Sequence, residues 1–287
     1  MTMTWPIAMQ ALVTAFDDDG EIDIDNHRHN LLCAIDAGTS GVLIGGSTGE
    51  GPYLEPGERN ELIRVAREVS PDLTILCGVF AESSRSANAQ VMEAADSGAN
   101  AILVVTPTTL MRNRDSWVVE YFEWVADLSP LPAFLYSVPA VTGYELPCES
   151  VAELAGHPNI VGMKDSGGDV QRLVDIAAIL SDDFIVYTGK STALAASFER
   201  GAYGAITASA NYAFSSVAAA SQGDLAAQAT LTEVTAVVER HGVPGTKFAA
   251  SVVGMRPGKG RGPLPELSID VRDTITTTCR ALVTNIW

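Results

Sequence analysis

The chain has 287 residues, 47% of them apolar, which is enough to bury a large core in one α/β barrel or in two ordinary domains. Its 18 basic and 35 acidic residues give a formal net charge of −17, and a surface of that sign repels phosphate backbones and anionic membranes. Nucleic acids and membranes are therefore not expected as partners.

Cysteine usage and the start of the chain indicate a reducing compartment. The four cysteines lie far apart and form no C-x-x-C pair, which argues against a disulfide framework or a zinc site. Residues 1–10 contain neither the basic segment nor the long apolar segment of a secretion signal. No run approaches the roughly 18 consecutive apolar residues of a membrane span. We expect a soluble, cytoplasmic protein.

Strand-like runs and helical patterns alternate along the chain. Eight short runs are apolar throughout, as parallel strands covered on both faces require: 7–16, 41–45, 73–79, 101–105, 133–136, 160–164, 184–188 and 203–207. Seven segments between them have helical spacing: 25–37, 56–69, 83–97, 116–128, 147–155, 169–180 and 191–200. Ser83 and Asp169 stand where N-caps belong, and Gly38, Gly98 and Gly201 stand where left-handed C-caps belong.

This alternation predicts a (β/α)8 barrel, with a doubly wound open sheet as the alternative. Residues 1–213 would form the barrel. Residues 214–287 would add helices over 218–240, 247–253 and 269–283, interrupted by a loop over 254–265. No linker separates the two parts, so we expect a C-terminal helical appendage that packs on the barrel as one structural unit.

Lys164 is the most informative candidate, because barrel chemistry belongs at the C-terminal ends of strands. It closes the apolar run 160–164, and the whole chain has only four lysines. Burial disfavours the charged form of an amine, and a neutral amine attacks ketones to form a Schiff base. The alternative is a lysine that caps the strand and pairs with Asp165.

Two further strand ends suit the same chemistry. Tyr136 ends the fifth run, and a phenol there transfers protons during imine formation and C–C cleavage. Its alternative is simple aromatic packing at the barrel rim. The glycine-rich loop 45–51 follows the second run, and its hydroxyls and backbone N–H groups suit a substrate carboxylate.

Other motifs carry less weight. Residues 45–49 match the G-x-S-x-G pattern of hydrolases, with His157 or His241 as a base, but prolines follow where a helix should begin. Residues 254–260 resemble a phosphate loop but lack the preceding strand. The four histidines show no metal-ligand spacing, so no metal is expected.

Three segments together resemble one known family. Residues 46–50 (GSTGE), 136–139 (YSVP) and 162–166 (GMKDS) are similar, in order and in spacing, to the dihydrodipicolinate synthase / N-acetylneuraminate lyase family. The similarity extends over almost the whole chain, from residues 14–16 to residues 263–265. It implies a class I aldolase or lyase that acts on pyruvate and other 2-oxo acids, needs no cofactor beyond the lysine imine, and assembles as a homotetramer, a dimer of dimers.

The resemblance also implies roles for individual residues. Lys164 would form the imine, and Tyr136 would be the acid/base. Ser47 and Thr48 would hold the substrate carboxylate, and one of them, Thr48 in particular, would continue the proton relay. The remaining lining of the pyruvyl pocket would come from Gly189 and Ile206.

Departures from the family pattern bear on the substrate. Val141 stands where synthases that make dihydrodipicolinate carry an arginine. Thr108 and Thr109 stand where most members place a tyrosine of the proton relay. Lys190 replaces a small or acidic residue, and with Arg112 it would recognise a distal carboxylate or phosphate; surface positions are the alternative for both.

These features lead to ranked hypotheses. The local segments 136–143 and 157–169 are most similar to 4-hydroxy-2-oxoglutarate aldolases, and 140–143 also to 2-keto-3-deoxygluconate aldolases. We therefore expect cleavage of such a 2-oxo acid to pyruvate and an aldehyde. The alternatives are a sugar-acid dehydratase or decarboxylase that uses the same imine, dihydrodipicolinate synthesis, and a silent barrel that only binds a 2-oxo acid.

Overall fold

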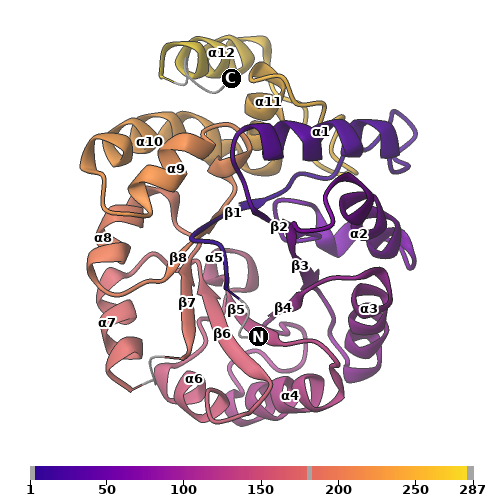
Figure 1. Cartoon of the computed structure of the whole chain (residues 1–287), viewed down its shortest axis with the longest axis vertical. Helices are drawn as coiled ribbons and strands as arrows, with labels where there is room; N and C mark the ends of the chain where they lie inside the picture. Colours follow the sequence, from indigo (N-terminus) through magenta and orange to yellow (C-terminus); the bar gives the residue numbers. More distant parts are fainter. Residues whose placement is uncertain (1–3, 180–182, 283–287) are drawn as a thin grey trace.

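A closed barrel of eight parallel strands forms the centre of the molecule. The computed structural model describes residues 4–179 and 183–282. The strands follow one another around the barrel in chain order, and β1 pairs with β8 to close it (Figure 1). They are β1 (Ala8–Ala11), β2 (Gly41–Ile44), β3 (Thr74–Val79), β4 (Ala101–Val105), β5 (Ala133–Ser137), β6 (Ile160–Asp165), β7 (Ile185–Thr188) and β8 (Gly204–Thr207). The predicted (β/α)8 barrel is confirmed, and the open sheet is wrong.

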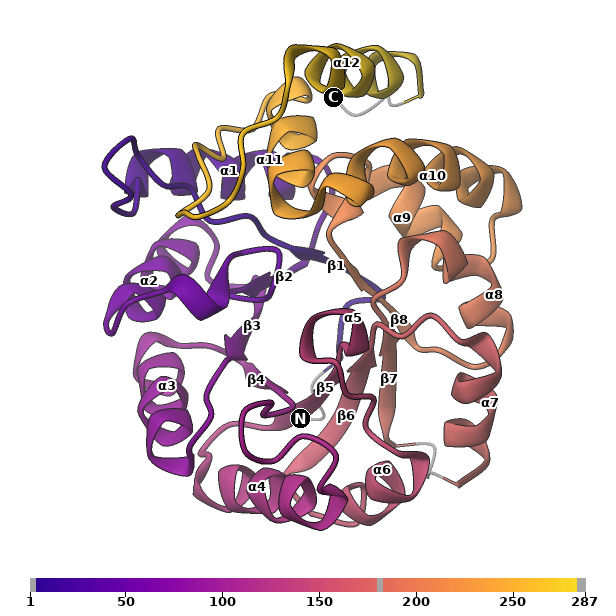
Figure 2. The same ribbon diagram turned by 180° about the vertical axis from the view of Figure 1, so that it is seen from behind.

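Helices form a ring around the strands, and the last ones extend beyond it (Figures 1 and 2). The ring begins with α1 (Ile24–Asp36), α2 (Glu58–Val69), α3 (Ser84–Ser97) and α4 (Asp115–Leu128). It continues with α6 (Cys148–Leu154), α7 (Val170–Ile179), α8 (Leu194–Glu199) and α9 (Phe214–Ala220), whereas the short α5 (Pro139–Thr142) lies inside the ring. The chain then forms α10 (Leu225–Val238), α11 (Gly242–Val252) and α12 (Ile269–Leu282). None of the helices in the described part of the chain has the length and apolar content needed to cross a bilayer.

Most predicted helices and caps are confirmed, with some shifts at the ends. Ser83 accepts a hydrogen bond from the backbone N–H of Ser86, and Gly38, Gly98 and Gly201 all have positive φ. The short α5 was not predicted. The predicted ends at Leu180 and Val283 lie outside the described residues.

The predicted strand over residues 7–16 is too long. β1 ends at Ala11, because the next residues turn to other partners: the backbone N–H of Val13 donates to the side chain of Asn211 at 3.0 Å. Phe16 forms only isolated bridges, to Ile22 and Gly258.

The single helix predicted over residues 218–240 is wrong. Two helices, α9 and α10, cover this region, and Asp224 begins the second one by accepting hydrogen bonds from the backbone of Ala226 and Ala227. A strong N-cap in the middle of an apolar pattern therefore divides the segment. The helix predicted over 247–253 begins earlier, at Gly242.

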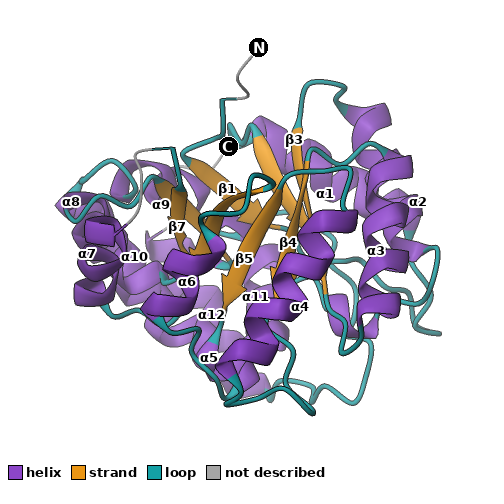
Figure 3. Ribbon diagram, turned by 90° about the horizontal axis from the view of Figure 1, so that it is seen from below, coloured by secondary structure: helices purple, strands orange, loops and turns teal. Residues whose placement is uncertain are grey.

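Side chains fill the N-terminal end of the barrel, so a ligand can bind only at the C-terminal end. Trp5 is buried at the N-terminal end, where its ring meets Phe134 edge-on at 4.9 Å, and Tyr187 donates to the Pro6 carbonyl. Figure 3 shows α5 at the opposite end, toward which the strand arrows point. The C-terminal helices share one apolar cluster with Ala8 of β1 and Ala205 of β8. A ligand site therefore belongs at the α5 end.

Candidate active site

Lys164 and Tyr136 lie side by side at the C-terminal end of the barrel. They are register partners on β6 and β5, and the amino group of Lys164 donates to the phenol oxygen of Tyr136 at 3.3 Å. The same amino group lies 4.4 Å from the centre of the tyrosine ring. Both side chains are almost fully buried. The parallel pairing of two neighbouring strands thus places an amine against a proton donor.

Ser47 extends this contact to a third element. Its hydroxyl lies 3.3 Å from the phenol oxygen of Tyr136, so hydroxyl, phenol and amine form a continuous chain from the loop after β2 to β6. Ser47 and its neighbour Thr48 are half-buried, and the loop is therefore accessible to a small ligand. The loop is compact: a side chain at Gly51 would collide with the carbonyl of Gly45.

The surroundings of Tyr136 favour loss of its proton. Burial alone would raise the pKa of this phenol. The positive charge of Lys164 and hydrogen bonds from Ser47, Ser166 and Lys164 outweigh burial, and the pKa of Tyr136 is lowered. A phenol with a lowered pKa accepts and returns protons more readily near neutral pH.

Asp165 has a different cationic partner from the one considered in the sequence. Its Oδ2 accepts a hydrogen bond from Nε of Arg172 at 2.8 Å, and its Oδ1 accepts one from the backbone N–H of Gly167. Arg172 also donates to the Leu146 carbonyl. The carboxylate thus ties the end of β6 to α7, while the amino group of Lys164 contacts Tyr136.

Gly189, which follows β7, lies beside Lys164, whereas Ile206 lies on β8, two strands away from β6. A Cβ on Gly189 would collide with the hydroxyl of Ser166 and come within 2.9 Å of Cε of Lys164, so only glycine leaves room here. Ile206 belongs to the apolar layer inside the barrel and is fully buried. Ser166 belongs to the 162–166 segment, but the sequence did not predict a role for it. In the structure, hydrogen bonding from its side chain helps to lower the pKa of Tyr136.

The threonines that replace the relay tyrosine are bound to a carboxylate. Glu82, at the end of β3, accepts from the hydroxyl of Thr108 at 2.8 Å and from the backbone N–H groups of Thr108 and Thr109. Burial would raise the pKa of Glu82, but these hydrogen bonds outweigh it and lower the pKa. The hydroxyl proton of Thr108 is therefore donated to Glu82. Sequence reasoning missed Glu82, whose only signal was its place after a strand.

The two cations proposed for a distal anion lie on the same rim but outside the buried chain of contacts. Arg112 is exposed, and a Cβ on Gly143 would lie 3.4 Å from its Nη1. Lys190 is also exposed and packs its stem against Gly168. Figure 2 shows the loop before α4 and the loop after β7 on either side of α5. Among residues 4–179 and 183–282, no group of three or more metal-ligating side chains is found.

Comparison with known proteins decides the family. The model of the dihydrodipicolinate synthetase family matches residues 7–282. This chain belongs to that family. The family's members are enzymes, class I pyruvate-dependent aldolases and synthases that act through a lysine Schiff base.

Curated relatives from several bacteria are named 4-hydroxy-tetrahydrodipicolinate synthase. One from Azoarcus sp. (strain BH72) is 32% identical and covers 94% of this chain and 96% of its own length. One from Xanthomonas axonopodis pv. citri is 38% identical over 70% of this chain and 67% of its own length.

Solved structures of the family superimpose closely. A prophage protein of E. coli K12, solved in complex with pyruvate, has a TM-score of 0.89 and 27% identity, covering 96% of this chain and 98% of its own. The dihydrodipicolinate synthase of Acinetobacter baumannii, also solved with pyruvate, has a TM-score of 0.88 and 28% identity, with the same coverage. The barrel of this chain is therefore the family barrel over nearly its whole length.

Proposed function

We propose that this chain cleaves a 4-hydroxy-2-oxo acid, of the 4-hydroxy-2-oxoglutarate or 2-keto-3-deoxy sugar acid type, to pyruvate and an aldehyde. The observation that carries the proposal is the chain of contacts from Ser47 through Tyr136 to Lys164. It supplies a buried nucleophilic amine, a buried proton carrier and, at the accessible end, a hydroxyl for the carboxylate. We further propose that the enzyme is a cytoplasmic homotetramer.

Each step has a residue that performs it. Lys164 attacks the keto carbon, and Tyr136 protonates the oxygen that leaves as water, which gives a protonated imine. Tyr136 then accepts the proton of the C4 hydroxyl as the C3–C4 bond breaks. The bond's electron pair moves to the imine, and the products are an aldehyde and an enamine. Protonation of the enamine and hydrolysis release pyruvate and restore Lys164.

Ser47 and Thr48 hold the substrate carboxylate in this scheme, and Gly189 and Ile206 shape the space beside the imine. Arg112 and Lys190 are the candidates for an anionic group at the far end of the substrate. Both are exposed at the rim, where long side chains reach over a bound ligand.

A second candidate is 4-hydroxy-tetrahydrodipicolinate synthesis, which the names of the curated relatives favour. Val141 weighs against it. This residue lies on α5 at the mouth of the site, is 60% exposed and uncharged, and stands at the position where the resemblance expects an arginine in such synthases.

Product analysis separates the candidates. The purified chain is incubated with 4-hydroxy-2-oxoglutarate and with 2-keto-3-deoxygluconate, and pyruvate is followed with a coupled dehydrogenase. We expect pyruvate and an equal amount of aldehyde. Products that retain every carbon, or that lose CO2, would show a dehydratase or decarboxylase instead. Pyruvate consumption that requires an amino aldehyde, with no cleavage of either acid, would establish the synthase.

A further inference from the structure

The loop that carries Ser47 and Thr48 contains an unusual residue, Glu50. Its backbone is left-handed, with φ of 57°, a conformation that residues with side chains rarely adopt. Its N–H donates to the Ser47 carbonyl at 3.1 Å, so the turn at Glu50 directly determines where Ser47 lies. Its side chain is only 1% exposed, although it carries a carboxylate. Something must hold this residue in place.

The C-terminal segment supplies what holds it. Oε1 of Glu50 lies 2.6 Å from the amino group of Lys247 on α11, and Oε2 accepts from the backbone N–H of Arg261 at 2.7 Å. Lys247 is 3% exposed, so the ion pair is buried on both sides. Together with Lys164, Lys247 is one of two buried lysines among the four in the chain.

Lys247 is itself fixed from several directions. Its amino group donates to the Lys259 carbonyl at 2.5 Å and lies 4.8 Å from the centre of the Phe16 ring. The guanidinium of Arg261 lies 4.3 Å from the same ring and pairs with Glu58 at 2.6 Å. A buried ion pair seldom gives more stability than an apolar pair of the same shape, and its best-attested use is to fix one arrangement. Here that arrangement joins α11 to the loop after β2.

We infer that Lys247 and Glu50 form a positioning pair for the substrate carboxylate. Lys247 holds the carboxylate of Glu50, Glu50 holds the left-handed turn, and the turn presents Ser47 and Thr48 to the ligand. The C-terminal helices are thereby part of the binding site although none of their residues touches the reacting atoms. This inference rests on the proposed function, in which the 45–51 loop binds the carboxylate of a 2-oxo acid.

The test compares two probes that differ only in the carboxylate. Borohydride trapping on Lys164 is followed at low concentrations of pyruvate and of methyl pyruvate, in the wild type, Lys247→Met, Glu50→Gln and the double variant. We expect the initial trapping rate with pyruvate to fall at least 10-fold in the variants, and the rate with methyl pyruvate to change less than 3-fold. The amount of adduct at saturating pyruvate should stay within 3-fold of the wild type.

Controls separate positioning from folding. Lys259→Met removes a lysine of the same segment whose partner, Asp18, is exposed, and it should behave as the wild type. If a single variant with one buried, unpaired charge does not fold, the double variant, which has no buried charge left at this place, carries the test.

Two results would overturn the inference. One is normal trapping of pyruvate by folded variants, and the other is an equal loss for both probes, because either outcome makes the pair merely structural. A wild-type chain that forms no pyruvate adduct would instead overturn the proposed function, and the inference with it.

Discussion

At the scale of single residues, the surroundings of Tyr136 lower the pKa of its phenol and so favour proton transfer. Its pKa is lowered because the charge of Lys164 and hydrogen bonds from three side chains outweigh its burial. We expect Tyr136→Phe to lower kcat by roughly 10²–10⁴-fold, the usual contribution of general acid–base catalysis. Steady-state kinetics on the cleaved acid measure the loss. A variant with unchanged kcat would contradict the role assigned to the phenol.

Gly189 gives a second prediction at this scale. A methyl group there would meet Ser166 and Lys164, so we expect Gly189→Ala to lower kcat/KM by about 100-fold or more, since small displacements of reacting groups are costly. Denaturant unfolding should show a loss of about 1–3 kcal/mol, typical of overpacking. Ser166 is the nearer of the two side chains, so the double variant Ser166→Ala, Gly189→Ala should be more active than Gly189→Ala alone. Full activity of Gly189→Ala alone would show that the site has space to spare.

The residues that are predictable from sequence are those that end strands. Lys164 and Tyr136 follow from the rule that barrel chemistry lies at strand ends, and their contact follows from the pairing of β5 with β6. Glu82 and Lys247 do not follow, because what matters for them is a partner far away in the chain, Thr108 in one case and Glu50 in the other. No local pattern encodes such a pairing.

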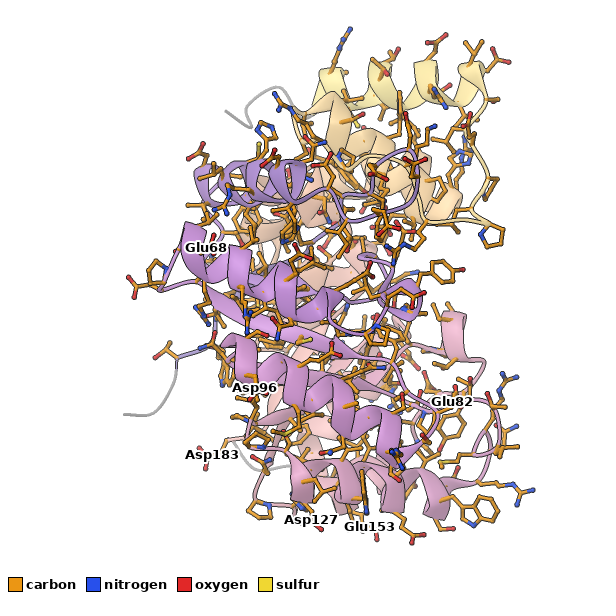
Figure 4. The ribbon with its side chains drawn as sticks, turned by 90° about the vertical axis from the view of Figure 1, so that its right-hand side faces the viewer. Glu68, Glu82, Asp96, Asp127, Glu153 and Asp183 are labelled. Atoms are coloured by element: carbon orange, nitrogen blue, oxygen red, sulfur yellow. The ribbon has the colours of Figure 1, made fainter. Side chains whose placement is uncertain are left out.

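At the scale of elements, several helices end on acidic residues. Glu68, Asp96, Asp127, Glu153 and Glu199 each lie in the last turn of a helix. Figure 4 shows Glu68, Asp96 and Asp183 on one side of the barrel and Glu82 on the opposite side. Carboxylates near helix C-termini interact unfavourably with the helix dipole. Glu68 and Asp127 are paired with Arg28 and His157, but Asp96 is exposed, and its charge is therefore expected to lower stability.

Reversing one such charge should stabilise the protein. We expect Asp96→Lys, at an exposed position near the end of α3, to raise the free energy of unfolding by about 0.5–1 kcal/mol at low salt. The matched control is Asp25→Lys in the first turn of α1, which should lower it. Urea unfolding of both variants measures the two changes. The same sign for both would mean that net charge, and not the dipole, decides the effect.

Elements were predictable where one signal dominates. The eight apolar runs located every strand. β1 is shorter than the run over residues 7–16, because the backbone N–H of Val13 donates to the side chain of Asn211 instead of to a neighbouring strand. The segment after β8 was harder, since apolar spacing continued across the Asp224 cap that separates α9 from α10. Periodicity predicts that helices exist, whereas side-chain hydrogen bonds decide where they begin.

At the scale of the whole molecule, a buried neutral histidine links stability to pH. Burial lowers the pKa of His27 from 6.5 to about 4, and its ring Nε2 contacts the Leu62 carbonyl of α2 at 3.2 Å. As the pH falls from about 6.5 to about 4, His27 binds a proton in the unfolded chain but stays neutral in the folded chain. The stability present above pH 6.5 is therefore lost over this window, by about 3 kcal/mol in all.

Replacing His27 should make the free energy of unfolding depend less on pH between about 6.5 and 4. Urea unfolding at several pH values between 4 and 7 should show a smaller loss for His27→Gln than for the wild type, whatever the variant's stability at pH 7. Identical slopes for the two proteins would mean that folding does not lower the pKa of His27.

Schiff-base formation by Lys164 is tested most directly by borohydride trapping with pyruvate, followed by mass spectrometry of the peptides. We expect one reduced adduct, on Lys164, because this amine is buried against Tyr136 at the carboxyl ends of the strands. An adduct on Lys190 instead would move the site to the rim and contradict the assignment. No adduct at all would contradict Schiff-base chemistry in this chain and favour a barrel that binds a 2-oxo acid without turning it over.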